Sequence, residues 1–385
     1  MTIYLDNSAT TRPYKEVTER MAEVMGETYG NPSSLHRLGL EAEKTVKQSR
    51  EILAESLGVK PEEVFFTGSG TEADNIAIYG GARALKRRGK KIITDGIEHP
   101  AVLETFRALE QEGFETVHLG VDEHGLIDLD QLASELTEDT VLVSMMHVNN
   151  ELGTIQPVEE AGKLLKGREK LYFHVDAVQS FGKLPMAPVT STADLVAVSA
   201  HKIHGPKGMG ALYVRKGTNL RSPVTGGGQE KGLRSGTENV PGIAGFGKAV
   251  EITCRDLEER TRKIRAVRDY LMEGIEAEIP EIRINSFRDE RCVCSVLNVS
   301  FPGVRGEVLL HMLEQSGIYV STGSACSSHK KGQSHVLKTA GLTDEEIEGA
   351  IRFSFSADNT KEEMDAVLDC LKKSVASIRK ITRKR

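Results

Sequence analysis

Short β-branched runs alternate with amphipathic helical segments between about residues 60 and 215 of the chain. This alternation is typical of a mostly parallel β-sheet whose faces are covered by helices. We predict strands at 64–67, 91–94, 116–119, 141–145, 171–175, 195–199 and 211–214. The turn before the last strand is too short for a crossover helix, so this strand is predicted to be antiparallel to its neighbour. The expected fold class is therefore α/β, with a mostly parallel seven-stranded sheet.

A smaller unit is predicted for the C-terminal part of the chain. From about Pro241 a long helical pattern, which includes the charged stretch 256–268, leads to predicted strands at 296–301 and 351–355. We expect these elements to form a small α+β domain. The predicted division is an N-terminal segment (1–15) that packs near the small domain and the cleft, a large domain (16–253) and a small C-terminal domain (254–385). A chain of 385 residues is long enough to bury more than one core.

Composition narrows the class of protein. The formal net charge is −6, and basic residues cluster only in 377–385, so nucleic acid is not expected as a direct ligand. The basic segment 377–385 is interpreted as a solvated helix end. No stretch approaches the roughly 18 apolar residues of a membrane span, and the first residues do not resemble a secretory signal. The five cysteines form no CxxC pair, and their odd number argues against a disulfide framework. We expect a cytoplasmic small-molecule enzyme that needs neither membrane nor nucleic acid.

One lysine stands at a predicted strand end. The apolar run 195–198 leads directly to His201 and Lys202 and then to a glycine-rich turn. The carboxyl ends of parallel strands form the ligand-binding edge of open α/β sheets. Lys202 is therefore a candidate for a Schiff base with a carbonyl cofactor, whereas the alternative is an ordinary surface lysine in a turn.

A phosphate site is predicted where the strand 64–67 runs into Gly68-Ser69-Gly70-Thr71 and then a helix over 72–86. Glycines let backbone N–H groups approach an anion, the helix dipole favours negative charge, and the Thr71 hydroxyl can donate. No Walker lysine follows. The alternative is a plain βα turn in which Thr71 caps the helix.

Polar residues also follow other predicted strands, at the same edge of the sheet as Lys202. Asp176 ends the strand 171–175, with Gln179 one turn further on. An aspartate at that edge can pair with a protonated pyridine nitrogen and so keep a cofactor ring acting as an electron sink, although it can also serve as a helix N-cap. His99 and Asn150 also follow strands, and together with Thr71, Asp176 and Lys202 they are predicted to share one crevice.

The chain resembles the fold-type I pyridoxal-phosphate enzymes of the class V aminotransferase group, specifically the cysteine desulfurases of the NifS/IscS family. The resemblance extends over nearly the whole sequence. The matching blocks are Tyr-Leu-Asp-Asn-Ser-Ala-Thr-Thr (4–11), Gly-Asn-Pro-Ser-Ser-Leu-His (30–36), Gly-Thr-Glu-Ala-Asp-Asn (70–75), His-Val-Asn-Asn-Glu-Leu-Gly (147–153), His-Val-Asp-Ala-Val-Gln (174–179), Ser-Ala-His-Lys (199–202), Arg-Ser-Gly-Thr-Glu-Asn (234–239), Gly-Ser-Ala-Cys-Ser-Ser (323–328) and Ile-Arg-Phe-Ser (351–354). Several such blocks in family order are specific, whereas each alone is not.

The resemblance implies a role for each matching residue. Lys202 would hold pyridoxal 5′-phosphate as a Schiff base and move protons at the substrate Cα and at cofactor C4′, with Asp176 on the pyridine nitrogen. His99 would stack on the ring and assist proton transfer, Gln179 would reach the phenolic oxygen, and Asn150 would contact cofactor or substrate. The implied phosphate ligands are Gly70, Thr71, Ser199 and His201, completed from the neighbouring subunit of a homodimer by Thr237. Arg352 would bind the substrate carboxylate, a task suited to its planar fork.

Cys326 separates a desulfurase from other users of this cofactor. Its surroundings, 321–335, are small, polar and basic, which predicts an exposed loop with a reactive thiol. The usual alternative, a buried apolar cysteine, suits Cys254, Cys292, Cys294 and Cys370 better. The resemblance implies that the Cys326 thiolate takes the sulfur of L-cysteine as a persulfide and that L-alanine is released.

Several alternatives remain open at this point. A selenocysteine lyase or an aminotransferase could use the same fold, and an inactive sulfur-relay adaptor could keep it without turnover. Thr322 replaces a common serine of the family, and the C-terminus lacks the longer scaffold-docking tail of the main iron–sulfur assembly members. We therefore expect the sulfur acceptor to be either an iron–sulfur scaffold protein or an enzyme of tRNA or cofactor thiolation.

Overall fold

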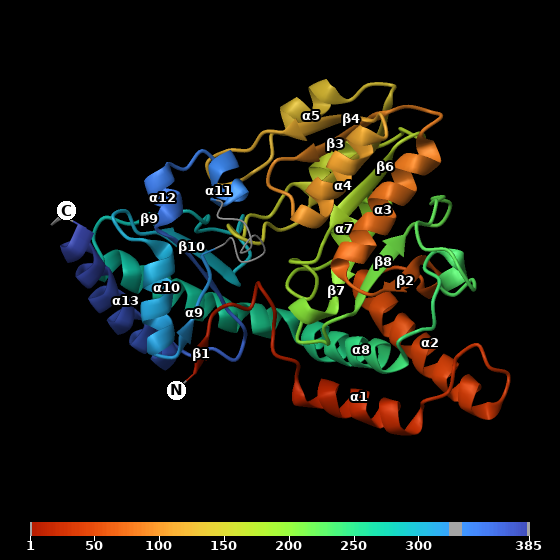
Figure 1. Cartoon of the computed structure of the whole chain (residues 1–385), viewed down its shortest axis with the longest axis horizontal. Helices are drawn as coiled ribbons and strands as arrows, with labels where there is room; N and C mark the ends of the chain where they lie inside the picture. The colour runs from red at the N-terminus through yellow and green to blue at the C-terminus, as the bar shows by residue number, and fades with distance from the viewer. Residues whose placement is uncertain (1, 323–332, 383–385) are drawn as a thin grey trace.

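The computed structural model describes residues 2–322 and 333–382. Two units lie side by side in Figure 1, one built around a large sheet and the other holding both ends of the chain. The helices α8 (Val240–Arg255) and α9 (Leu257–Glu278) follow one another between them, with only Asp256 separating the two helices. The site described below lies where the two units meet.

The large sheet has seven strands in the order β2-β8-β7-β6-β5-β3-β4. They are β2 (Val64–Thr67), β3 (Lys91–Asp95), β4 (Glu115–Leu119), β5 (Thr140–Met146), β6 (Tyr172–Asp176), β7 (Leu195–Ser199) and β8 (Gly210–Val214). Only β8 runs antiparallel to its neighbours, β2 and β7. The predicted strands and the antiparallel last strand are confirmed to within a residue or two at their ends.

Helices cover both faces of the large sheet. On one face α3 (Gly70–Leu85) and α4 (Pro100–Gln111) bury residues such as Ile78 and Phe106. The other face carries the main core, to which a second set of helices contributes. These helices are α1 (Lys15–Glu27), α2 (Arg37–Leu57), α5 (Leu129–Glu135), α6 (Val158–Leu165), α7 (Ala187–Thr192) and α8. Because the strands of the large sheet are buried on both faces, their sequences are continuous apolar runs.

The second unit contains a three-stranded antiparallel sheet of order β12-β10-β9. Its elements are β9 (Arg283–Ile284), β10 (Val296–Ser300), α10 (Gly306–Gln315), β11 (Ile318–Tyr319), α11 (His335–Thr339), α12 (Asp344–Glu348), β12 (Ala350–Ser354) and α13 (Lys361–Thr382). The N-terminal strand β1 (Ile3–Tyr4) pairs with β11, and Ile3 and Leu5 belong to the core of this unit. The exact domain boundaries at 15 and 253 stay a prediction.

The start of α3 differs from the predicted one. The helix begins at Gly70 because the Ser69 side chain accepts a hydrogen bond from the N–H of Glu72 and serves as the N-cap. Thr71 is therefore not the cap, and its hydroxyl is available for other partners. Three short 3₁₀ turns complete the fold: Pro61–Glu63, Ala200–Lys202 and Glu230–Gly232. In the described residues, no helix combines the length and the apolar character of a membrane span.

Candidate active site

A cavity of about 240 Å³ opens at the carboxyl ends of the large sheet's strands. It brings together nearly all of the residues that the sequence placed in one crevice. The predicted residues that line it are Gly70, Thr71, His99, Asn150, Asp176, Gln179, Ser199, His201, Lys202 and Arg352. We refer to it as the main cavity.

Lys202 ends the short 3₁₀ turn that follows β7. Its Nζ donates hydrogen bonds to the carbonyl oxygens of Ser8 and Ala9, the second at 2.9 Å. The N-terminal segment therefore lies directly on this lysine, more than 190 residues away in sequence. The expectation that this segment borders the cleft is consistent with these two contacts.

The start of α3 forms one end of the main cavity. The first N–H groups of a helix have no intrahelical acceptor, and Gly70 and Thr71 line the cavity there. A Cβ on Gly70 would lie 2.7 Å from Val178 Cγ2 and 3.3 Å from Ser199 Cβ, so only glycine allows this close approach. A helix N-terminus with nearby Ser199 and His201 side chains suits a phosphate group.

Asp176 and Asp74 line the main cavity, and they interact electrostatically with two further buried carboxyl groups, those of Asp95 and Glu98. Burial and, less strongly, the neighbouring Asp74 carboxyl raise the pKa of Asp176 to about 7, although the N–H of Val178 opposes this by donating to Asp176 at 2.8 Å. Burial also raises the pKa of Asp95 to about 7, and it raises the pKa values of Asp74 and Glu98 well above their usual range. Four like charges cannot all be ionised so close together, so a bound cation next to Asp176 would favour its carboxylate.

His174 and Ser144 lie between the carboxyl groups of Asp74 and Glu98. His174 Nδ1 lies 2.8 Å from Ser144 Oγ, which in turn is 3.5 Å from Glu98 Oε1. His174 Nε2 is 3.4 Å from Asp74 Oδ1, but the alignment is too poor for a hydrogen bond. Burial lowers the pKa of His174 to about 4, so the imidazole is neutral at pH 7.

His99 is held in a defined tautomer. It is the N-cap of α4, and its Nδ1 accepts a hydrogen bond from the N–H of Ala101 at 3.1 Å. Burial, with the nearby Lys202 and His335 charges, lowers the pKa of His99 to about 4. A neutral imidazole whose Nδ1 accepts must carry its proton on Nε2.

Arg352 lies on β12 and reaches the main cavity from the smaller unit. Its Nη2 is 2.8 Å from Asp6 Oδ1, and its Nη1 donates to the Asn150 carbonyl at 2.9 Å. The guanidinium is almost fully buried, and its Nε has no hydrogen-bond partner among the described residues. Nη1 and Nη2 of Arg352 are thus bonded within the protein, whereas the Nε N–H has no acceptor among the described residues.

Two predicted site residues are not in the main cavity. Thr237 lines a separate cavity of about 160 Å³, together with Gly68 and Arg234. Cys326 lies outside the described residues. The described chain on either side of 323–332 contacts residues at or next to the main cavity: Ser321 pairs through its backbone with Arg352, which lines it, and Ser334 Oγ donates at 2.6 Å to Oε2 of Glu151, the residue after the lining Asn150.

Sequence reasoning missed several residues of the site. Ser8, Asp74 and Val178 line the main cavity, and Asp6 holds Arg352. Asp74 had a usable signal, because it lies three and four residues after Thr71 and Gly70 and so shares their face of α3. The backbone carbonyl of Ser8 and the ion pair of Asp6 with Arg352 had none, since both depend on contacts between distant parts of the chain.

Comparison with known proteins places this site in context. The chain matches the aminotransferase class-V family model over residues 3–367. It is 44% identical over 381 residues to the cysteine desulfurase IscS of Clostridium botulinum (strain Hall), a match that covers 99% of this chain and 96% of the relative. IscS of Methanosarcina thermophila is 44% identical over 380 residues, covering 99% and 93%. A solved NifS-like protein superposes with a TM-score of 0.91 at 41% identity, covering 98% of this chain and 100% of the other.

Proposed function

Since the chain belongs to the aminotransferase class-V family and is a pyridoxal-phosphate-dependent cysteine desulfurase of the IscS/NifS type, we propose which of its residues convert L-cysteine to L-alanine and accept the sulfur. The assignment covers the residues of the main cavity and Cys326. Supporting it is the convergence of Lys202, Asp176, His99 and Arg352 on one cavity at the sheet edge.

The residues of the main cavity fit pyridoxal 5′-phosphate at both ends. Gly70, Thr71, Ser199 and His201 would hold the phosphate at the start of α3, and Asp176 would hold the pyridine nitrogen. Three polar atoms of cavity-lining residues, Ser8 Oγ, Asp74 Oδ1 and Arg352 Nε, are buried without a hydrogen-bond partner among the described residues, as expected for a cavity that receives a polar ligand. When bound, the cofactor supplies an electron sink that labilises bonds at the substrate Cα and Cβ.

The protein's own groups then supply binding and proton transfer. Lys202, once released, removes the Cα proton, and the carbonyls of Ser8 and Ala9 keep its Nζ at the cavity. His99 is neutral at pH 7 and carries its proton on Nε2, so it can stack on a flat ring without adding a charge beside the Lys202 ammonium. Arg352 and Asn150 form the end of the cavity assigned to the substrate carboxylate.

The sulfur is assigned to Cys326. Its thiolate attacks the substrate sulfur, the Cβ–S bond breaks, and the products are a Cys326 persulfide and, after protonation, L-alanine. Thr322, the nearest described residue on one side, follows Ser321, whose backbone pairs with that of Arg352. Four residues of fully extended chain span at most about 13 Å, which supports assigning Cys326 to the substrate end.

We also propose a homodimer that passes its sulfur to an acceptor protein, either an iron–sulfur scaffold or an enzyme of tRNA or cofactor thiolation. Large apolar side chains are exposed at the end of α1 and the start of α2: Met25, Tyr29, Leu35, Leu38 and Leu40. Leu35 is 95% exposed and Tyr29 is 70% exposed, which is unusual for a free surface. This set, named here the α1–α2 patch, supports a subunit interface, and the Thr237 contribution to a partner's phosphate site depends on it.

The test of this assignment is a comparison of two cysteine variants in the purified holoenzyme. Cys326→Ser is expected to keep the cofactor's visible absorbance and to lose sulfide release from L-cysteine in the presence of a thiol reductant. Cys370→Ser, which changes a partly exposed cysteine on α13, is expected to keep both. Sulfide release by C326S at the wild-type rate would refute the assignment.

A further inference from the structure

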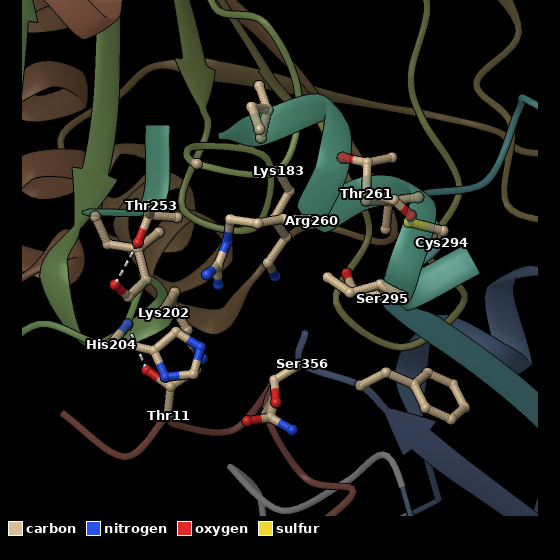
Figure 2. Close-up of a pocket in the computed structure, with 17 residues that line it drawn as sticks. Thr11, Lys183, Lys202, His204, Thr253, Arg260, Thr261, Cys294, Ser295 and Ser356 are labelled. Atoms are coloured by element: carbon tan, nitrogen blue, oxygen red, sulfur yellow. Dashed lines mark hydrogen bonds between the residues drawn. The ribbon is translucent and has the colours of Figure 1, made fainter. Parts of the chain in front are cut away.

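A second cavity lies behind the main one. It has a volume of about 30 Å³, enough for one or two water molecules, and Lys202 lines both cavities. In Figure 2 the side chains of Lys183 and Arg260 extend toward the middle of this second cavity, with Cys294 and Ser295 on one side and His204 and Thr11 on the other. The described residues that line it include no carboxylate. Lys183, a partly buried lysine, thus places in this cavity an amine that the mechanism above does not use.

Lys183 is connected to Lys202 by a chain of three hydrogen bonds. Lys183 Nζ donates to Gln179 Oε1 at 2.9 Å, and Gln179 Nε2 donates to the Ser8 carbonyl at 2.9 Å. The same Ser8 oxygen accepts from Lys202 Nζ. Gln179 lines the main cavity, so it stands between the two lysines and between the two cavities.

These partners determine which way the Gln179 amide faces. An ammonium has only donors and a backbone carbonyl has only an acceptor. The Gln179 oxygen must therefore face Lys183, and its NH₂ group must face Ser8 and the main cavity. Without the Lys183 donor, only the Ser8 carbonyl would hold the Gln179 amide in this orientation.

The charge state of Lys183 matters for this arrangement. Burial and, less strongly, the nearby Lys202 ammonium and Arg352 guanidinium lower its pKa to about 7, while the Cys294 thiol acts in the opposite direction. Lys183 Nζ keeps an N–H donor toward Gln179 in either charge state, and it carries the positive charge below about pH 7. Arg260 and His204 also face this cavity, and His204 is neutral at pH 7 because burial lowers its pKa to about 4. In the described residues Lys183 has no carboxylate within ion-pair distance, so Gln179 Oε1 is its hydrogen-bond acceptor.

We propose that Lys183 is a positioning residue of the desulfurase: its ammonium holds the Gln179 amide with the NH₂ group toward the main cavity, as a donor for the phenolic oxygen of the bound cofactor. This inference rests on the proposed function, because that function assigns Gln179 to the phenolic oxygen. Lys183 thus contributes in two ways: it fixes the orientation of the Gln179 amide, and it places a positive charge one side chain away from the position assigned to the phenolic oxygen.

A shift in the cofactor's own titration is the expected consequence. A donor and a positive charge near the phenolic oxygen stabilise its anionic form and so disfavour protonation of the cofactor–lysine linkage. Lys183→Met removes both effects. The pH midpoint of the holoenzyme's visible absorbance change is therefore expected to rise by about one unit, a tenfold change in proton affinity.

The experiment is an absorbance titration of the purified holoenzymes. Lys183→Arg keeps a donor and a charge and is expected to restore the wild-type midpoint. Ser295→Ala is the matched control, because Ser295 lines the same cavity and its buried hydroxyl has no hydrogen-bond partner among the described residues. Should K183M fail to fold, Lys183→Gln keeps a polar group in the cavity and is expected to shift the midpoint in the same direction.

The outcomes separate this inference from the proposed function. A wild-type protein without a Lys202-dependent visible band would contradict the proposed function itself. If the wild type shows this band and its pH midpoint is unchanged in K183M (or K183Q) and in S295A, the role of Lys183 is overturned while the proposed function stands. An equal shift in S295A would also overturn it, because that result would mean that any change in the second cavity disturbs the cofactor.

Discussion

Arg352 and Asp6, which are 346 residues apart in sequence, meet at the main cavity with 2.8 Å between Nη2 and Oδ1. This ion pair connects β12 with the segment that follows β1, so β12 and the first residues of the chain meet at the main cavity. The Arg352 backbone also pairs with Ser321. The residue proposed to bind the substrate carboxylate therefore also holds, through its backbone, the chain that leads toward Cys326.

Arg352→Lys is expected to raise the KM for L-cysteine by about 10- to 100-fold, because a point charge cannot replace a planar fork that is already held on Nη1 and Nη2. The effect on kcat is expected to be smaller. Steady-state alanine formation measures both. Arg283→Lys, which changes an arginine paired with Glu123 and Glu346 away from the cavity, is the control. An unchanged KM in R352K would mean that the substrate carboxylate binds elsewhere.

Lys202→Ala is expected to lower alanine formation by on the order of 10²–10⁴-fold, since it removes the group assigned to proton transfer. Borohydride reduction of the wild-type holoenzyme, followed by peptide mass spectrometry, should place the cofactor on the peptide that contains Lys202. Lys207→Ala, an exposed neighbour in the same turn, should behave like the wild type. A cofactor attached to any other lysine would contradict the assignment.

Glu151→Gln is expected to change how stability depends on pH. Burial raises the pKa of Glu151 to about 7 from an ordinary 4.5, although the Ser334 hydroxyl and Arg352 oppose this shift. Because the folded state holds this proton more tightly than the unfolded state, Glu151 makes wild-type stability fall as the pH rises from about 4.5 to 7. The free energy of unfolding of E151Q minus that of the wild type should therefore be roughly 1–3 kcal/mol larger at pH 8 than at pH 5.

Urea denaturation at the two pH values measures this difference. Glu138→Gln changes an exposed carboxylate and should follow the wild type at both. A stability difference between E151Q and wild type that is the same at pH 5 and pH 8 would show that Glu151 does not titrate in this range.

Leu35→Asp is expected to weaken the proposed homodimer, because it places a charge in the most exposed apolar side chain of the α1–α2 patch. Light scattering coupled to gel filtration should show a wild-type dimer and a variant shifted toward monomer. Leu164→Asp on α6 alters a leucine that is 40% exposed elsewhere and should stay dimeric. A monomeric wild type, or an L35D variant that stays as dimeric as L164D, would argue against this interface.

The strand ends could be predicted because each strand is short, apolar and followed by a polar residue at the edge where parallel strands bind ligands. Lys202, Asp176, Thr71 and His99 could therefore be predicted to share one crevice without contact information, and all four line the main cavity. Contacts between distant segments leave no such pattern. The Asp6 ion pair, the Ser8 carbonyl and the bond from Lys183 to Gln179 appear only once the N-terminal segment lies over Lys202.

Lys183 illustrates this limit most clearly. In the sequence it is a lysine after a glycine, typical of an exposed turn. Its burial follows from the packing of α9 and of the residues before β10, both more than 70 positions later in the chain. The charge state of a side chain is determined by such neighbours, so a sequence pattern alone could not predict its pKa.

The central claim is that sulfur leaves L-cysteine for Cys326. Its most direct test is mass spectrometry of the wild-type holoenzyme after brief exposure to L-cysteine labelled with a heavy sulfur isotope, with thiols blocked and the protein digested. We expect one additional, labelled sulfur atom on the peptide that contains Cys326 and none on the peptides of Cys254, Cys292, Cys294 or Cys370. Labelled sulfur on one of those four peptides, or alanine formed while the Cys326 peptide stays unmodified, would contradict it.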